Sequence, residues 1–108
     1  MLKVTLLTEG EKLSLRLEGH AGYAEHGKDI VCASATILVG TVAQYAKLAN
    51  EHGDFTIPPE IVLNSGDAFV CCEATEEVKK MFAFAELGYR LLQHNYPQYV
   101  EIKSVGQA

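Results

Sequence analysis

The fold is indicated most directly by residues 13–36, which read LSLRLEGHAGYAEHGKDIVCASAT. In the first part, Leu13, Leu15 and Leu17 alternate with polar residues, a period of two that is typical of a half-buried β-strand. In the last part, apolar and small residues follow one another from Ile30 onward, which predicts a buried helix. The stretch therefore predicts a strand and a helix joined by a polar, glycine-bearing loop.

A histidine and a cysteine stand at the two ends of this loop. His20 follows the predicted strand, and Asp29 is a good N-cap residue that places Cys32 in the first helical turn. The nucleophile of thiol chemistry is the thiolate, which an imidazole can generate and a helix N-terminus can stabilise. We therefore predict a small cysteine hydrolase with His20 as base and Cys32 as nucleophile. Backbone N–H groups at the helix start are expected to hold the oxyanion.

The residues around this pair have expected supporting roles. Asp29 could cap the helix or orient His20, and the sequence leaves both roles open. The loop 21–28 is our candidate lid, because its glycines and its lack of an apolar anchor predict that it becomes ordered only over substrate. The glycines that we assign to this loop and its approach are Gly19, Gly22 and Gly27.

The rest of the chain supplies the other elements of an α+β fold. Two hairpins are predicted, one pairing residues 2–6 with 13–17 and one pairing 61–63 with 68–72, followed by a closing strand over 99–103. Helices are predicted over 30–50 and 76–94. We expect a single domain over 1–108, with a mostly antiparallel sheet packed against two helices.

Composition limits the classes of partner. The chain has 108 residues, 48% of them hydrophobic, and its formal net charge is −5. This charge speaks against direct binding of nucleic acid and is compatible with a basic partner. No apolar run approaches the roughly 20 residues that span a membrane, so no membrane partner is expected. We expect a cytoplasmic protein whose three cysteines are reduced.

Two other interpretations of the sequence compete with that of an enzyme, namely a metal-binding protein and a non-enzymatic module. His20, His26 and Cys32, with Asp29, offer metal-ligand types, but neither a Cys-x-x-Cys nor a His-Glu-x-x-His spacing occurs, so we expect no metal and no other cofactor. His26 is expected to be an exposed loop residue. In the second alternative the protein is a non-enzymatic module, in which Cys32 is buried and inert.

The C-terminal helix carries more apolar surface than one buried face needs. Its second apolar line consists of Phe84, Leu87 and Leu91. Such a line indicates a contact with another subunit.

The loop region also resembles a known family. Gly19-His20-Ala21, followed by Gly27-x-Asp29-Ile30-Val31-Cys32-Ala33, closely resembles the signature of the ribosomal-processing cysteine protease family, Prp. The order of elements is similar over nearly the whole chain. The resemblance implies that His20 and Cys32 are the catalytic pair and that Asp29 is the signature aspartate. Thr36 stands where the family often has serine, which keeps a hydroxyl.

The resemblance also implies a function. It implies a homodimeric α+β endopeptidase that removes a short N-terminal extension from ribosomal protein twenty-seven of the large subunit during ribosome assembly. The reaction would pass through a thioester acyl-enzyme. The alternative is a ribosome-associated dimeric module without catalytic activity.

Overall fold

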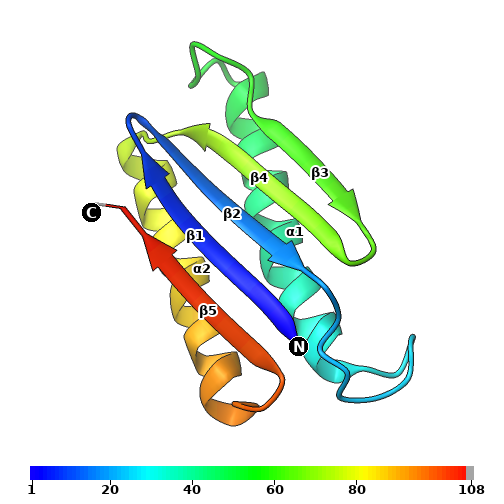
Figure 1. The fold of residues 1–108 in the computed structure, drawn as a ribbon. Coiled ribbons are helices and arrows are strands. Elements are labelled where there is room, and N and C mark those ends of the chain that lie inside the picture. Colours follow the sequence, from blue (N-terminus) through cyan, green and yellow to red (C-terminus); the bar gives the residue numbers. More distant parts are fainter. Residues whose placement is uncertain (107–108) are drawn as a thin grey trace.

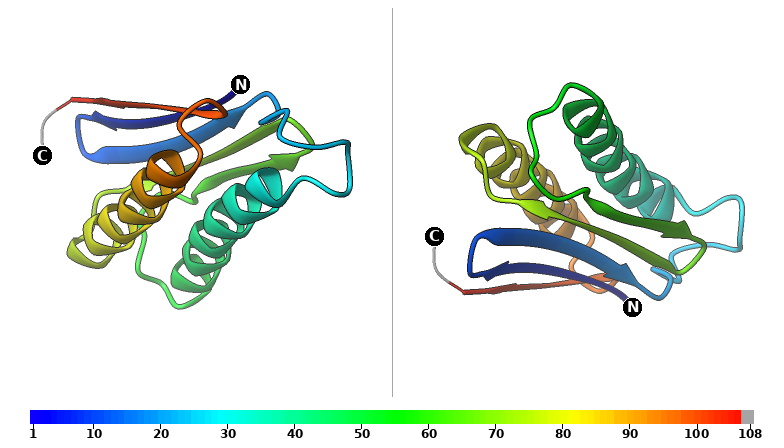
Figure 2. Two further views of the ribbon diagram at one scale, coloured as in Figure 1. Left: turned by 90° about the horizontal axis from the view of Figure 1, so that it is seen from below. Right: turned by 90° about the horizontal axis from the view of Figure 1, so that it is seen from above.

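The protein is a two-layer molecule in which both helices cover the same face of a five-stranded sheet (Figures 1 and 2). The computed structural model describes residues 1–106. Its elements, in chain order, are β1 (Leu2–Glu9), β2 (Lys12–Glu18), α1 (Ile30–Glu51), β3 (Glu60–Asn64), β4 (Asp67–Glu73), α2 (Glu76–Asn95) and β5 (Val100–Val105). The predicted α+β class and every predicted strand and helix are confirmed. The last two residues of the predicted domain, 107–108, lie outside the described part.

The strand order of the sheet is β3-β4-β2-β1-β5. The two hairpins are antiparallel and join through β2 and β4, whereas β5 lies parallel to β1. Because β2 and β4 are neighbours, the end of β2 lies beside the β3–β4 turn. Glu18 pairs with Asp67, and the Gly19 N–H donates to the Gly66 carbonyl at 2.9 Å. This pairing brings the first residue of the predicted active-site loop against a turn that is distant in sequence.

The core lies between the sheet and the helices. Alternate residues of the strands form cross-strand apolar rows on the helical side, with Val4, Leu17 and Ala68 in one row and Leu6, Leu15 and Val70 in the next. Burial of such rows is the main favourable contribution to folding. On the other face of the sheet, the Arg16 guanidinium lies 4.4 Å from the centre of the Phe69 ring and bonds to Asp67. The two faces therefore follow the alternation seen in the sequence.

Helix α1 packs against the sheet mainly through small side chains. Its buried positions are Val31, Ala35, Val39, Val42, Ala43, Ala46 and Ala49. The Tyr89 hydroxyl of α2 donates to the Ala35 carbonyl at 2.9 Å, which joins the two helices inside the core. By length and composition α1 could also cross a membrane, a test that the core helices of globular proteins pass as well.

Helix α2 has the two apolar lines that its sequence predicts. Thr75 caps it by accepting from the Val78 N–H at 3.1 Å. The inner line is buried against the core and includes Phe82 and Tyr89. The outer line, Phe84, Leu87 and Leu91, is exposed at 74%, 66% and 63%.

The connection between α1 and β3 is tied to the end of β4. The Glu73 carboxylate accepts hydrogen bonds from the Thr56 N–H, from the Thr56 hydroxyl at 2.6 Å and from the Ile57 N–H at 2.9 Å. These bonds outweigh desolvation, and the pKa of Glu73 is lowered, first of all by the Thr56 hydroxyl. The linker is thus fixed by one carboxylate.

Candidate active site

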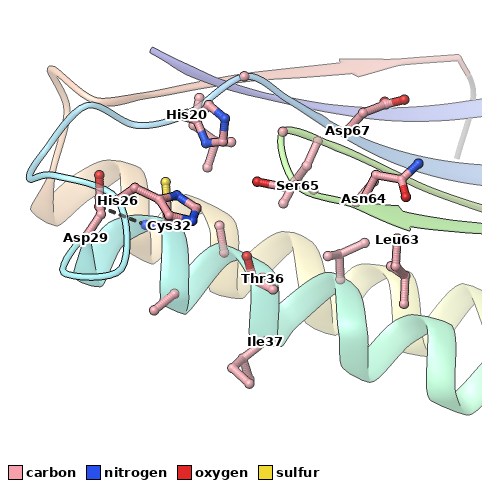
Figure 3. Close-up of a pocket in the computed structure, with 18 of the residues that line it drawn as sticks. His20, His26, Asp29, Cys32, Thr36, Ile37, Leu63, Asn64, Ser65 and Asp67 are labelled. Atoms are coloured by element: carbon pink, nitrogen blue, oxygen red, sulfur yellow. Dashed lines mark hydrogen bonds between the residues drawn. The ribbon is translucent and has the colours of Figure 1, made fainter.

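A cavity of about 780 Å³ lies between the first half of α1, the exit of β2 and the β3–β4 turn (Figure 3). Its lining includes the residues singled out from the sequence, namely Gly19, His20, Gly22, Gly27, Asp29, Cys32 and Thr36. The structure therefore brings together residues from the strand end, the loop and the helix start. It also adds residues 63–68 of the β3–β4 hairpin, which the sequence did not connect with the site.

Cys32 lies in the first turn of α1 and is half-buried. Its Sγ accepts a hydrogen bond from the Ala21 N–H at 3.2 Å. The same bond holds the start of the loop, where Ala21 is buried, against the thiol.

His20 emerges from β2 with an exposed imidazole on the loop that covers the cavity (Figure 3). The Nε2 end of its ring faces the backbone of Gly66. Its centroid lies 6.3 Å from that of His26, with the rings edge to face. His26 is exposed, as predicted, but it also lines the cavity, and its nearness to His20 was not foreseen.

Asp29 is the most heavily hydrogen-bonded side chain of the site. Its Oδ1 accepts from the Val31 and Cys32 N–H groups, both at 3.0 Å, and its Oδ2 accepts from the Tyr23 N–H at 3.0 Å and the Ala24 N–H at 3.3 Å. Burial opposes its ionisation, but the four hydrogen bonds together outweigh burial and lower the pKa of Asp29. Both oxygens are thus bonded to backbone, an arrangement that favours the capping role over orientation of His20.

The predicted source of the oxyanion donors is wrong for residues 31–33. The N–H groups of Val31 and Cys32 already donate to the Asp29 carboxylate, and the Ala33 N–H donates to the Asp29 carbonyl at 3.0 Å. A cap that satisfies the first amides of a helix leaves them unavailable to a ligand. A strong N-cap and an oxyanion hole therefore compete for the same groups.

The prediction that the loop lacks an apolar anchor is also wrong. The Tyr23 ring lies 5.3 Å from the rings of both Tyr96 and Tyr99, edge to face in each case. These partners come from the connection between α2 and β5, which no local pattern places near the loop. The first part of the loop is therefore held by aromatic contacts as well as by Asp29, while a turn at residues 25–28 projects beyond it (Figure 2).

The cavity continues as a groove along α1. Thr36 lies one helical turn after Cys32, and its oxygen is turned into the cavity (Figure 3). Beyond it the lining includes Ile37 and Gly40 on α1, and Leu63 and Asn64 on β3. Within residues 1–106, no group of three His, Cys, Asp or Glu side chains is placed to hold a metal ion.

A half-buried thiol in the first turn of a helix, with imidazoles in the same cavity and an apolar groove beside it, places the molecule in the class of thiol hydrolases. The model of the family described as "Cysteine protease Prp" matches residues 1–101. The chain belongs to the Prp family of cysteine proteases, the family that its sequence resembles.

Named relatives agree with this assignment. The chain is similar to the "Ribosomal processing cysteine protease Prp" of Mycoplasma genitalium, with 31% identity over 86 residues, 79% of this chain and 81% of that protein. It is also similar to the proteins of that name from Staphylococcus aureus (38% over 52 residues) and Bacillus subtilis (44% over 41 residues). These two matches span only 49% and 37% of those proteins.

Solved structures share the fold. SMU.848 from Streptococcus mutans has a TM-score of 0.68 and 27% identity, covering 99% of this chain and 96% of its own. The S. aureus ribosomal processing protease Prp, solved in complex with a covalently linked product peptide, has a TM-score of 0.72 and 21% identity, covering 97% of this chain and all of its own. The whole two-layer arrangement is therefore common to these proteins.

Proposed function

We propose that the protein is an endopeptidase that removes the N-terminal extension of a large-subunit ribosomal protein precursor, with Cys32 as nucleophile and His20 as base. The observation that carries the proposal is the shared cavity of the Cys32 thiol and the His20 imidazole in a chain of the Prp family. The precursor of ribosomal protein twenty-seven of the large subunit is the substrate to test first. Since such precursors are made in the cytoplasm, the protease is expected to act there, without a cofactor.

The mechanism follows from the groups present. His20 takes the proton of the Cys32 thiol, and the thiolate attacks the carbonyl carbon of the scissile peptide bond. When the tetrahedral intermediate collapses, the C–N bond breaks, the imidazolium gives its proton to the leaving amine, and a thioester remains. His20 then removes a proton from a water molecule that attacks the thioester, which releases the carboxylic acid product and restores the thiol.

The neighbouring residues support these steps. The Ala21 N–H, 3.2 Å from Sγ, stabilises the thiolate before the attack. Asp29 is a positioning residue that holds both the helix start and the loop, through the hydrogen bonds described above. The Thr36 hydroxyl, on the cavity wall, is placed to bond to the substrate backbone.

The groove sets the length and character of the bound substrate. From Cys32 to Gly40 the helix rises roughly 12 Å, which corresponds to about four residues of extended peptide. Because the Ile37 and Leu63 side chains line this part, apolar substrate side chains are favoured on this side of the scissile bond. The net charge of −5 further favours a basic ribosomal protein and makes cleavage slower at high salt.

A homodimer is part of the proposal. The outer line of α2 (Phe84, Leu87 and Leu91) exposes a continuous apolar strip on the helical face. A second copy of this chain, burying the same strip against its own, removes it from water. Analytical ultracentrifugation tests this: we expect a dimer for the parent and a monomer for Leu87→Glu. Gln44→Glu, at an exposed position of α1, adds the same single negative charge and serves as the control. A monomeric parent would contradict the dimer but not the protease.

The protease itself is tested by intact-mass spectrometry of the precursor. We expect the parent to release one defined N-terminal fragment, and Cys32→Ala and His20→Ala to release none. Cys71→Ala and His52→Ala are matched controls on residues outside the cavity and should cleave like the parent. Failure of the parent to cleave a precursor that carries an extension would point to the non-enzymatic module. Cleavage by His20→Ala at the parent rate would remove His20 from the mechanism.

A further inference from the structure

The tip of the β3–β4 hairpin lies directly against the imidazole of His20. If Gly66 carried a methyl group, that carbon would lie 3.0 Å from Nε2 and 3.4 Å from Cε1 of His20. A distance of 3.0 Å is tighter than nine in ten real contacts of a Cβ atom, so the ring would have to shift by a few tenths of an ångström. The Gly19 N–H also donates to the Gly66 carbonyl, which fixes the residue before His20 to the same turn.

We propose that Gly66 is a positioning residue for His20: the absence of a side chain at this turn lets the imidazole remain over the cavity that holds Cys32. The inference rests on the proposed role of His20 as base. Because the Nε2 end of the ring faces Gly66, the Nδ1 side is directed away from the hairpin. The position of the ring is thus set by backbone from a distant hairpin, with His26 on the loop side.

Displacement of the His20 ring should cost little folding stability but should slow the proton transfer. His20 is exposed, so its side chain can turn into solvent without disturbing the core. Proton transfer, however, depends on the position of the imidazole relative to the thiol, and a misplacement of about 1 Å can cost about 100-fold in rate. A methyl group at position 66 should therefore reduce activity without unfolding the protein.

The test compares two glycines with similar backbone conformations. Gly66 has φ of +76° and Gly10, at the tip of the β1–β2 hairpin, has φ of +61°, so alanine strains the backbone at both. A methyl group on Gly10 would have no described atom within 4 Å, apart from its own chain neighbours. We expect Gly66→Ala and Gly10→Ala to lower the melting temperature by similar amounts. Only Gly66→Ala should lower kcat, by about 3- to 10-fold for a ring shift of a few tenths of an ångström, with little change in KM.

A third variant separates the effect of backbone strain from the effect of the contact between a Cβ atom and His20. Asparagine tolerates a positive φ better than alanine but still carries a Cβ. Gly66→Asn should therefore be more stable than Gly66→Ala and remain as slow in kcat. Parent-like kcat in either Gly66 variant, with a stable fold, overturns the proposal, as does an equal loss of kcat in Gly10→Ala.

The same series keeps this inference distinct from the proposed function. The probes are the ribosomal protein precursor and iodoacetamide, which reports the reactivity of Cys32 at neutral pH. If the parent cleaves, His20→Ala does not, and Gly66→Ala matches Gly10→Ala in both assays, only the role of Gly66 fails. If His20→Ala cleaves and alkylates like the parent, the role of His20 itself fails.

Discussion

Replacing Asp29 by asparagine tests whether one carboxylate joins the catalytic helix to the loop that covers the site. In Asp29→Asn, the side-chain carbonyl oxygen can still accept from the Val31 and Cys32 N–H groups and so keep the cap. The new NH₂ group would then face the Tyr23 and Ala24 N–H groups, where the parent has Oδ2 as acceptor. The donors of the new NH₂ group would then face the two backbone donors of the loop. No hydrogen bond can form there, and the loop should separate from the helix.

The expected loss of stability is set by these two bonds. Hydrogen bonds to a charged group contribute roughly 1.5–3 kcal/mol each when their loss leaves a buried group unpaired. Tyr23 and Ala24 are exposed residues, so water can replace the lost acceptor, and we expect a total loss of about 2 kcal/mol. For a domain of this size that corresponds to a decrease in melting temperature of about 8 °C.

A three-variant series separates the cap from the loop. Asp29→Ser keeps a capping oxygen but is too short to reach the loop, so it should be as unstable as Asp29→Asn. Asp29→Ala loses the cap as well, at a further cost of about 1 kcal/mol. Denaturant unfolding measures these differences, and amide hydrogen exchange of Tyr23 and Ala24 reports the loop directly. Exchange as slow in Asp29→Asn as in the parent would refute the joining role, and equal stability of the serine and alanine variants would refute the cap.

The pH dependence of the loop contacts provides an independent test of the role of Asp29. Because the pKa of folded Asp29 is below its ordinary value of 3.8, the stabilisation is complete above pH 3.8 and is lost as the pH falls through the lower folded value. The protection of the loop amides in the parent, taken relative to the intrinsic exchange rate at each pH, should therefore fall only below about pH 3.8, provided that the experiment stays above the pH of global acid unfolding. Asp29→Asn should show no such fall in protection.

Three further predictions concern the loop, the linker and the thiols. Tyr23→Ala removes two aromatic contacts, each contributing about 0.5–1.5 kcal/mol, and should speed proteolytic nicking of the loop, whereas Tyr23→Phe should not. The hydrogen bond from the Thr56 hydroxyl is the largest cause that lowers the pKa of Glu73, so the α1–β3 connection should loosen as the pH falls below 4.5. Glu73→Ala, which has no acceptor, should show weak amide protection there at every pH. Burial raises the pKa of the Cys72 thiol to about 12, so iodoacetamide at neutral pH should modify Cys32 first; preferential labelling of a β4 cysteine would contradict this.

The elements of the fold could be predicted from sequence because their patterns are local. Alternation in β1 and β2 and the two apolar lines of α2 are visible within a few residues. Each element up to α2 has wider bounds than predicted, and β5 begins one residue later and ends two residues later than predicted. The strand order could not be predicted in the same way. The parallel pairing of β5 with β1 and the contact of β2 with β4 join distant segments, and no periodicity records which strands meet.

The site could be predicted only as far as its residues are neighbours in sequence. His20, Asp29 and Cys32 belong to one loop and one helix start, so their types and spacing carry the information. The residues around Gly66 predict a turn, but nothing in the sequence predicts that this turn contacts the imidazole of His20. The aromatic partners of Tyr23 were missed for the same reason, and this led to the expectation of an unanchored lid.

The occupied helix N-terminus changes which group controls the thiol. A free N-terminus would stabilise a thiolate through its first amides. Here the Asp29 carboxylate accepts from the Val31 and Cys32 amides and brings a negative charge to the start of α1. The start of α1 is therefore a less favourable place for a second negative charge than a free helix N-terminus would be. The groups that remain to act on the Cys32 thiol are the Ala21 N–H, at 3.2 Å from Sγ, and the imidazole of His20. A site of this kind depends on where its histidine is held, which is why a hairpin glycine far along the chain is expected to affect the rate.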